Sequence, residues 1–270
     1  MAKKVRHVLG ISGGKDSAAL AIYLKQKNKV PDIEYFFTDT GVELPEIYTF
    51  LDKLEIYLGR KIKRLGFDQA TKTGKDFFHH LKMKDGMLPS PQQRWCTKDM
   101  KLAPFEEFIG NDECISYIGI RADENREGYI SNKKNIKPVF PFIEDGLVRE
   151  DIFNLLRETV GIPKYYEWRS RSGCFFCFFQ RREEWLGLAE RHPKEFARAV
   201  EMEKQEGGKG YTWIQGMTLE ELVERKDEIL ANSKKRKEQL AKKKDNRSWQ
   251  DILIEDGQDD EDQACLICSL

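Results

Sequence analysis

Short apolar runs alternate with amphipathic stretches over the first half of the chain. Four runs have the length and composition of buried strands: 7–11, 33–38, 61–65 and 114–120. Two stretches between them carry apolar residues at helical spacing: 17–27 and 45–58. This alternation predicts an α/β fold with a parallel twisted sheet and flanking helices. Ligands of such sheets bind where the strands end, so the loops after the strands are the first place to look for a site.

The pattern becomes helical after residue 141. The stretches 150–159, 181–203 and 218–244 each have helical spacing, and Thr218 with Glu221 forms a capping box at the start of the last one. We therefore predict a nucleotide-binding α/β domain over 1–140. We expect a helical region with a C-x-x-C pair over 141–232, and a charged tail ending in a second C-x-x-C pair over 233–270.

Charge is divided unevenly along the 270 residues. Lys and Arg total 46, as do Asp and Glu, so the formal net charge is zero. The segment 233–247 nevertheless holds eight basic and two acidic residues, whereas 255–262 holds six acidic residues and no basic one. We expect 255–264 to be disordered because of its acidic residues and its Gly and Gln content. A neutral total does not exclude a nucleic-acid partner, since a local basic patch is sufficient to bind one.

Composition excludes several classes of protein. Hydrophobic residues make up 40% of the chain, which is enough for a core and rules out collagen-like, mucin-like and wholly disordered chains. No apolar run approaches the roughly 18 residues that span a bilayer, and the first residues lack the apolar stretch of a signal peptide. We therefore expect a cytoplasmic protein with no membrane partner.

The segment Ser12-Gly13-Gly14-Lys15-Asp16-Ser17 joins the first predicted strand to the first predicted helix. A glycine-rich turn at a helix N-terminus presents backbone N–H groups and the positive end of the helix dipole, both of which favour phosphate. The spacing is neither the Walker A pattern nor the dinucleotide G-x-G-x-x-G pattern. The competing interpretation is an ordinary tight turn with a helix cap.

The segment resembles the PP-loop, SGGxDS, of the ATP pyrophosphatase superfamily. Later segments resemble blocks of its phosphoadenosine phosphosulfate (PAPS) reductase branch, in the same order. They are Thr38-Asp39-Thr40-Gly41 with Glu43, Pro45 and Tyr48; Trp95-Cys96-Thr97-Lys98; Gly119-Ile120-Arg121 with Glu124 and Arg126; and Gly173-Cys174-x-x-Cys177. The resemblance covers residues 5 to about 190 and implies the Rossmann-like fold of the adenine nucleotide alpha hydrolases.

The resemblance also implies roles for individual residues. The nucleotide-binding set would be Ser12, Gly13, Gly14, Lys15, Asp16, Ser17, Asp39, Gly119, Arg121 and Arg126. Asp39 would lie near the nucleotide and a Mg²⁺ ion, which takes one or two carboxylates in such sites. The catalytic set would be Lys15, Asp39, Arg121 and Cys268. For the arginines, the alternative is a surface ion pair with Asp123 or Glu124.

Six cysteines raise the question of a metal centre. Thiolates hold iron–sulfur clusters or Zn²⁺, usually four at a time. The resemblance implies a [4Fe–4S] cluster, with Zn²⁺ as the alternative, on Cys96, Cys174, Cys177 and Cys268. The fourth ligand remains open among Cys268, Cys265, Cys114 and a non-protein ligand. A redox disulfide and two small buried residues are the other interpretations of Cys174 and Cys177.

Two departures from the branch stand out. Cys96 lies between Trp95 and Thr97, where the cluster-bearing assimilatory reductases have adjacent cysteines. The chain ends Ala-Cys-Leu-Ile-Cys-Ser-Leu instead of in the E-C-G-[IL]-H tail that holds the nucleophilic cysteine of those reductases.

The first functional hypothesis is an enzyme that cleaves ATP to AMP and pyrophosphate to activate a target for sulfur transfer, as in DNA phosphorothioation or tRNA thiolation. The second is a sulfonucleotide reductase that releases sulfite, and the third is a non-catalytic nucleotide-binding subunit. Besides the adenine nucleotide, the candidate partners are a nucleic acid on the basic run, a sulfur-donor protein such as a cysteine desulfurase, and a second copy of the chain.

Overall fold

The computed structural model describes residues 5–245 apart from 29, 31, 125–132 and 205–209. The described residues form two compact units. The α/β unit comprises 5–77 and 95–174, and the helical unit comprises 78–94 and 175–245. The segment 255–264, predicted to be disordered, lies outside the described residues. The domain boundaries at 140 and 232 stay predictions.

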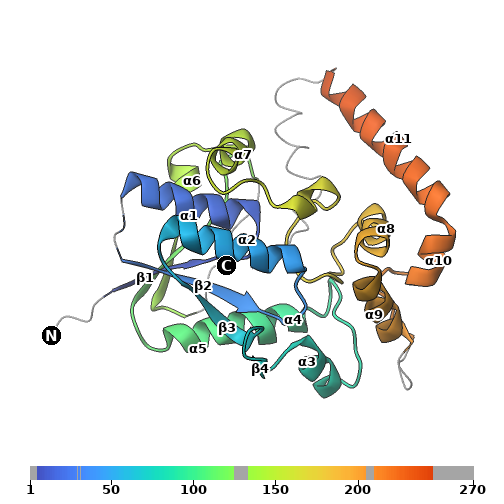
Figure 1. Ribbon diagram of the computed structural model, residues 1–270, viewed down its shortest axis with the longest axis horizontal. Coiled ribbons are helices and arrows are strands. Elements are labelled where there is room, and N and C mark those ends of the chain that lie inside the picture. The colour runs from blue at the N-terminus through green and yellow to red at the C-terminus, as the bar shows by residue number, and fades with distance from the viewer. Residues whose placement is uncertain (1–4, 29, 31, 125–132, 205–209, 246–270) are drawn as a thin grey trace. The chain divides into compact units, whose positions relative to one another are not determined.

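A six-stranded sheet forms the centre of the α/β unit (Figure 1). In chain order its strands are β1 (Arg6–Gly10), β2 (Ile33–Asp39), β3 (Ile62–Asp68), β4 (Thr73–Gly74), β5 (Cys114–Tyr117) and β6 (Ile136–Val139). Their order in the sheet is β4-β3-β2-β1-β5-β6, and every pairing is parallel except that of β3 with β4. The predicted parallel α/β fold is confirmed. The predicted strand 114–120 ends earlier, at Tyr117.

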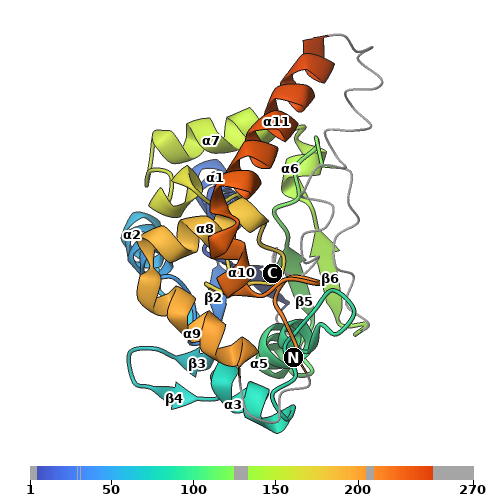
Figure 2. The same cartoon turned by 90° about the vertical axis from the view of Figure 1, so that its right-hand side faces the viewer.

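Helices cover both faces of this sheet. They are α1 (Lys15–Lys27), α2 (Pro45–Leu58), α4 (Trp95–Thr97), η1 (Lys98–Leu102), α5 (Ala103–Ile109), α6 (Pro141–Glu144), α7 (Arg149–Arg157) and η2 (Lys164–Glu167). Figures 1 and 2 show α1, α2 and α7 on one face and α5 on the other. Phe36 of β2 stacks on Phe105 of α5, with the ring centroids 5.0 Å apart and both side chains buried. The core therefore lies between the sheet and these helices.

The strand order places a topological reversal at β1. From β1 the chain moves outward through β2 and β3, and later returns to the other side of β1 as β5 and β6. In open parallel sheets, such a reversal separates the loops that follow the two neighbouring strands and leaves room for a ligand at their carboxyl ends. The PP-loop directly follows β1, so the fold places it at this position.

The helical unit contains most of α3 (Phe77–Met83) together with α8 (Arg182–Arg191), α9 (Pro193–Glu203), α10 (Leu219–Glu224) and α11 (Lys226–Asp245). Its core contains Trp213, whose ring lies 5.0 Å from that of Phe176 and 5.9 Å from that of Trp185. All three side chains are buried. This unit confirms the predicted helical C-terminal region.

Two predicted helices are interrupted. The stretch 181–203 divides at His192 because Pro193 lacks an N–H group and begins the next helix. The stretch 218–244 divides at Arg225, whose backbone is not helical. The predicted capping box is confirmed, since the Glu221 N–H group donates to Thr218 Oγ1 at 3.2 Å and the Thr218 N–H group donates to Glu221 Oε2 at 2.8 Å. None of the described helices has the length and apolar character to cross a membrane.

Candidate nucleotide site

The PP-loop is shaped by its two glycines and two serines. Gly13 has a φ of +75°, and a Cβ atom there would lie 2.6 Å from Ile47. The Ser12 N–H group donates to Ser17 Oγ at 3.1 Å, and the Gly14 N–H group donates to Ser12 Oγ at 3.3 Å. Gly14 is the N-cap of α1, with no side-chain cap. The first turn of a 13-residue helix therefore directs its N–H groups into the loop, as a phosphate site requires.

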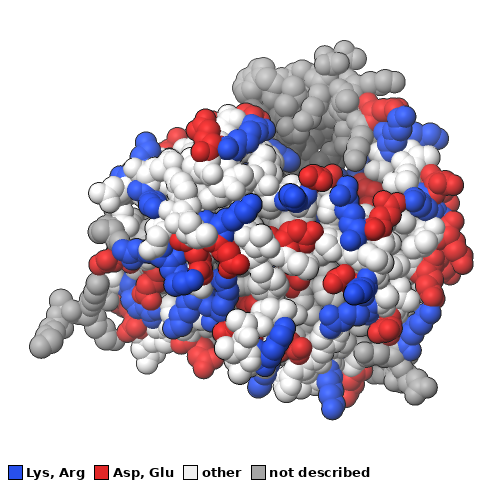
Figure 3. Space-filling model, viewed as in Figure 1, with Lys and Arg blue, Asp and Glu red and all other residues white. Residues whose placement is uncertain are grey.

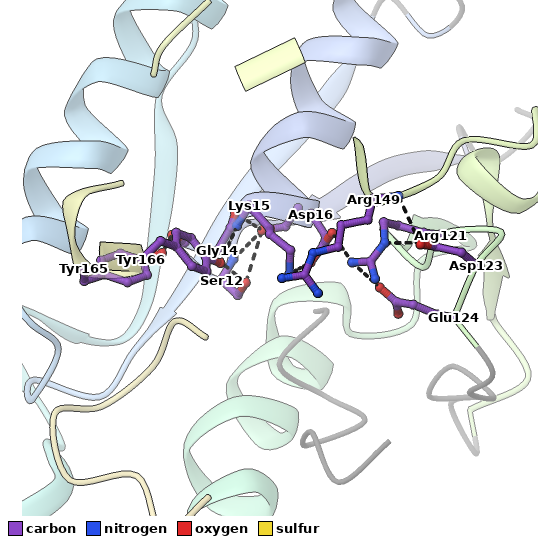
Figure 4. Close-up of polar contacts among 12 residues, drawn as sticks. Ser12, Gly14, Lys15, Asp16, Arg121, Asp123, Glu124, Arg149, Tyr165 and Tyr166 are labelled. Atoms are coloured by element: carbon purple, nitrogen blue, oxygen red, sulfur yellow. Dashed lines mark hydrogen bonds and ion pairs between the residues drawn. The ribbon is translucent and has the colours of Figure 1, made fainter. Parts of the chain in front are cut away.

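A segment distant in sequence closes over this loop. We call residues 163–174 the strap. The Tyr165 hydroxyl donates to the Gly13 carbonyl at 2.5 Å, and the Tyr166 hydroxyl accepts the Lys15 N–H group at 2.9 Å (Figure 4). Burial raises the pKa of both tyrosines, so both hydroxyls keep their protons near neutral pH. One N–H group suited to phosphate is thus already bound to a protein hydroxyl.

The strap also limits the space around Gly14. A Cβ atom on Gly14 would lie 2.7 Å from Ser172 Oγ. Tyr165, Tyr166 and Ser172 were not among the predicted site residues. The sequence carries no local signal for them, because a paired aromatic in a loop is equally typical of a core.

Arg121 is buried beside the PP-loop and is surrounded by carboxylates. Its guanidinium lies 2.8 Å from Asp16, 2.9 Å from Asp123 and 2.6 Å from Glu124, as Figure 4 shows. The predicted alternative, a surface ion pair with Asp123 or Glu124, is correct in its partners. The pair is buried and not at the surface, because only 3% of the Arg121 side chain is exposed. Arg121 therefore holds Asp16, and with it the first turn of α1.

Lys15 and Gly119 complete the surroundings of the loop. Lys15 Nζ lies 3.1 Å from Asp16 Oδ2 and faces the Tyr166 ring at 5.7 Å, and its side chain is buried. A Cβ atom on Gly119 would lie 3.0 Å from the Asp16 carbonyl oxygen, so the backbone at 119 packs directly against the loop. These predicted residues are thus brought together with the PP-loop.

Asp39 ends β2, the strand next to β1. Its Oδ1 atom accepts the Gly41 N–H group at 2.8 Å and the Tyr48 hydroxyl at 2.9 Å. Its side chain is 1% exposed, and Oδ2 accepts no hydrogen bond from the described residues. Burial raises the pKa of this carboxyl to about 6, with a contribution from Glu43 and opposition from Gly41 and Tyr48. A carboxylate oxygen without a protein donor fits the role of a Mg²⁺ ligand.

The end of the strap is attached to the turn after Asp39. Cys174 Sγ lies 3.2 Å from Thr40 Oγ1, and Cys174 pairs with Glu43 in a short antiparallel bridge. The buried Arg169 side chain donates to the carbonyl groups of Gly173 at 3.2 Å and Cys174 at 2.7 Å. The strap therefore connects the PP-loop to the Asp39 turn through hydrogen bonds within the α/β unit.

The predicted metal centre is not assembled by the described residues. Cys96 and Cys174 lie in the α/β unit and Cys177 in the helical unit, and no described group of three His, Cys, Asp or Glu residues is suited to a metal ion. Cys268, Cys265 and Arg126 lie outside the described residues. The cluster stays a prediction, and no step below is routed through it.

Cys114 does not fit the role of fourth ligand. It lies at the start of β5, opposite the strand ends that carry the site, and it is buried. Burial raises the pKa of its thiol to about 12, which disfavours the thiolate that metals bind.

Residues 6–143 match the protein family described as the phosphoadenosine phosphosulfate reductase domain. The chain belongs to this family. The matched segment includes β1 to β6 and, with them, the PP-loop, Asp39, Gly119 and Arg121. The membership predicted from the motifs is confirmed.

Relatives of this reductase-domain protein are diverse. An uncharacterized protein of Methanocaldococcus jannaschii, MJ0066, is 32% identical over 202 residues, which are 69% of this chain and 39% of MJ0066. The tRNA-specific 2-thiouridylase MnmA of Actinobacillus succinogenes is 27% identical over 137 residues, 46% of this chain and 33% of the thiouridylase. The chain thus spans less than half the length of either relative. A crystal structure of phosphoadenylyl-sulfate reductase from Candida auris aligns over 64% of this chain and 82% of its own, with 11% identity and a TM-score of 0.48.

Proposed function

We propose that the protein binds ATP with Mg²⁺ and cleaves it at the α-phosphate to AMP and pyrophosphate. An oxygen of the acceptor would attack the α-phosphorus, and the bond to the bridging oxygen of pyrophosphate would break. The terminal sulfur of a persulfide on a donor protein, such as a cysteine desulfurase, would then attack the adenylated centre, and AMP would leave with the former acceptor oxygen. A thiol reductant would cleave the resulting disulfide, release the thiolated acceptor and be oxidised to a disulfide. The observation that carries the proposal is the PP-loop beside a buried Asp39 carboxyl, at the ends of adjacent strands.

Each site residue has a specific part in this proposal. The N–H groups at the start of α1 and the Lys15 ammonium would stabilise the charge on the departing pyrophosphate, and donors placed in advance in this way are usually the largest catalytic contribution. The Asp39 oxygen without a hydrogen-bond donor would hold Mg²⁺, which supplies charge neutralisation between phosphate oxygens when bound. Arg121 would position Asp16.

Product analysis tests the proposal. Purified protein is incubated with ATP, Mg²⁺ and candidate acceptors, and the nucleotides are separated by chromatography. We expect AMP and pyrophosphate, and a loss of at least about a hundredfold in the Lys15→Ala, Ser17→Ala double variant. Lys53→Ala, which removes an exposed lysine of α2, is the matched control. Formation of ADP and phosphate, or full turnover by the double variant, would show that the proposal is wrong.

A sulfonucleotide reductase is the second candidate, favoured by the description of the matched family. In that case the nucleotide carries the sulfur, and a cysteine near the chain end attacks it. Sulfite release from adenylyl sulfate or its 3′-phosphorylated form, abolished by Cys265→Ser with Cys268→Ser, would favour the reductase. Tight ATP binding with neither product would instead favour the non-catalytic subunit.

A further inference from the structure

The helical unit contains a hollow that the proposed chemistry does not use. Its volume is about 870 Å³, within the range of roughly 300–1,000 Å³ typical of ligand sites. Its wall combines the start of α8, the turn 210–216, residues 90–92 and one side of α11. All of these belong to the helical unit, whereas the PP-loop belongs to the α/β unit.

The carboxylates of the hollow are already bound to neighbours. Glu183 accepts the Ser233 hydroxyl at 2.9 Å and pairs with Arg236 at 3.3 Å. Glu228 pairs with Arg225, which lies outside the hollow, at 2.8 Å. Arg182 is exposed on the wall and close enough to Glu228 for their charges to attract, but its N–H groups donate no hydrogen bond within the described part of the chain. The Arg182 guanidinium is thus available to an anion such as a phosphate.

A buried acceptor in the same wall lacks a donor. The Gln180 side chain is 7% exposed, and its Nε2 atom donates to the Phe175 carbonyl at 2.7 Å. Because that carbonyl needs a donor, the orientation of the amide is fixed, and Oε1 is the atom left without a hydrogen bond among the described residues. A buried polar atom without a hydrogen-bond partner raises the free energy of the folded protein. Oε1 therefore favours binding of a ligand that donates an N–H group to it.

Aromatic rings supply the third component. Tyr211 and Phe178 are half-buried in the wall of the hollow, with the buried Trp213 also lining it. Aromatic faces of this kind stack against nucleobases in proteins that bind single strands, and they do so with little dependence on sequence. A guanidinium, an amide acceptor and an aromatic face together match the phosphate, the amino group and the ring of one nucleotide.

We propose that this hollow binds a nucleotide of a single-stranded or looped nucleic acid. A strand is favoured over a free nucleotide because α11 also carries exposed basic residues outside the hollow, Lys234 and Lys235, which would meet further phosphates. Figure 3 shows acidic and basic side chains interspersed on the face it displays. One part of this inference rests on the proposed function: the role of the bound strand as the acceptor of sulfur.

Binding is measured by fluorescence anisotropy with a labelled 20-nucleotide single-stranded RNA, the same sequence as DNA, and the DNA duplex, all without ATP. We expect the single strands to bind more tightly than the duplex. Tyr211→Ala and Arg182→Gln are each expected to weaken binding about tenfold. Arg182→Gln should also reduce the slope of log Kd against log salt by about 0.7. The RNA and DNA arms identify the natural strand.

Matched variants exclude loss of folding. Tyr211→Phe keeps the ring and is expected to bind as the unaltered protein does. Lys194→Gln removes an exposed charge of α9 outside the hollow and should change neither the affinity nor the slope. Thermal melts of all variants accompany the titrations.

Three results would overturn the inference. They are an absence of single-strand binding, equal losses in Lys194→Gln and Arg182→Gln, and full competition by an acidic peptide, which would indicate a general anion surface. Strand binding that depends on Arg182 and Tyr211 without AMP formation would reject the proposed function alone. AMP formation with strand binding unaffected by both variants would reject this inference alone.

Discussion

Asp39 places a carboxyl group in the interior, and its pKa of about 6 predicts how stability depends on pH. Between about pH 4 and 6 the folded protein retains a proton that the unfolded chain has lost, so stability falls as the pH rises. Above pH 6 Asp39 is ionised in both states, and burial of its charge then lowers the free energy of unfolding by the full amount. Asp39→Asn keeps an oxygen for Gly41 and Tyr48 but removes the charge. We expect this variant to be more stable than the unaltered protein at pH 8, by up to about 3 kcal/mol.

Urea denaturation at pH 4 and pH 8 measures this effect. The two proteins should have similar stability at pH 4, which lies below the folded pKa of about 6 and close to the ordinary value of 3.8, because there the folded Asp39 is protonated and the unfolded one is only partly ionised. The same variant should lose the stabilisation that Mg²⁺ with ATP gives to the unaltered protein. An unchanged stability difference between the two pH values would contradict the assigned pKa.

The Tyr166 hydroxyl accepts the Lys15 N–H group, which under the proposed function would otherwise donate to a phosphate. Tyr166→Phe removes the competing hydroxyl, so we expect inorganic pyrophosphate to bind about fivefold more tightly, the equivalent of about 1 kcal/mol. Isothermal titration measures the affinity. Tyr165→Phe serves for comparison, because it removes the donor to the Gly13 carbonyl and should weaken binding. Weaker binding by Tyr166→Phe would mean that its hydroxyl assists the phosphate.

At the scale of the element, Thr218 fixes the start of α10. Its hydroxyl accepts the Glu221 N–H group, whereas at the starts of α7 and α8 the Asp151 and Glu184 side chains accept the N–H group of the N-cap residue instead. Thr218→Ala should lower the free energy of unfolding by about 1 kcal/mol, as loss of an N-cap usually does. Urea denaturation followed by circular dichroism measures the loss. Thr218→Ser retains the oxygen and should be nearly neutral, and an equal loss in both variants would refute the capping argument.

Helices and strands could be predicted from the sequence where the local residue types determine their bounds. The strands β1 and β2 have long apolar runs because both of their faces are covered by helices. The break at Pro193 was readable from the residue type, whereas nothing in the sequence marks the break at Arg225. The strand β6 escaped prediction because it is short, holds a lysine and Pro138, and lies at the edge of the sheet, where proline is tolerated.

At the scale of the whole molecule, the sequence predicts the parts of the site that are local motifs. The PP-loop, Asp39 and Arg121 could be located because each lies in a short motif near a strand end. The strap could not, because Tyr165 contacts Gly13 across 152 positions and Cys174 contacts Thr40 across 134. Such pairs follow from tertiary packing, which no local pattern records. Contacts of Cys268 remain a matter of prediction for the same reason.

The charges around the PP-loop have a consequence for the form in which substrate enters. Lys15, Arg121 and Arg149 contribute three positive charges among the residues labelled in Figure 4, while Asp16, Asp123 and Glu124 contribute three negative ones. The network therefore carries no surplus of positive charge to offset a triphosphate. Under the proposed function, the nucleotide would therefore bring its own counterion, and the ion pairs that hold the loop in place would favour the magnesium complex of ATP over the bare anion.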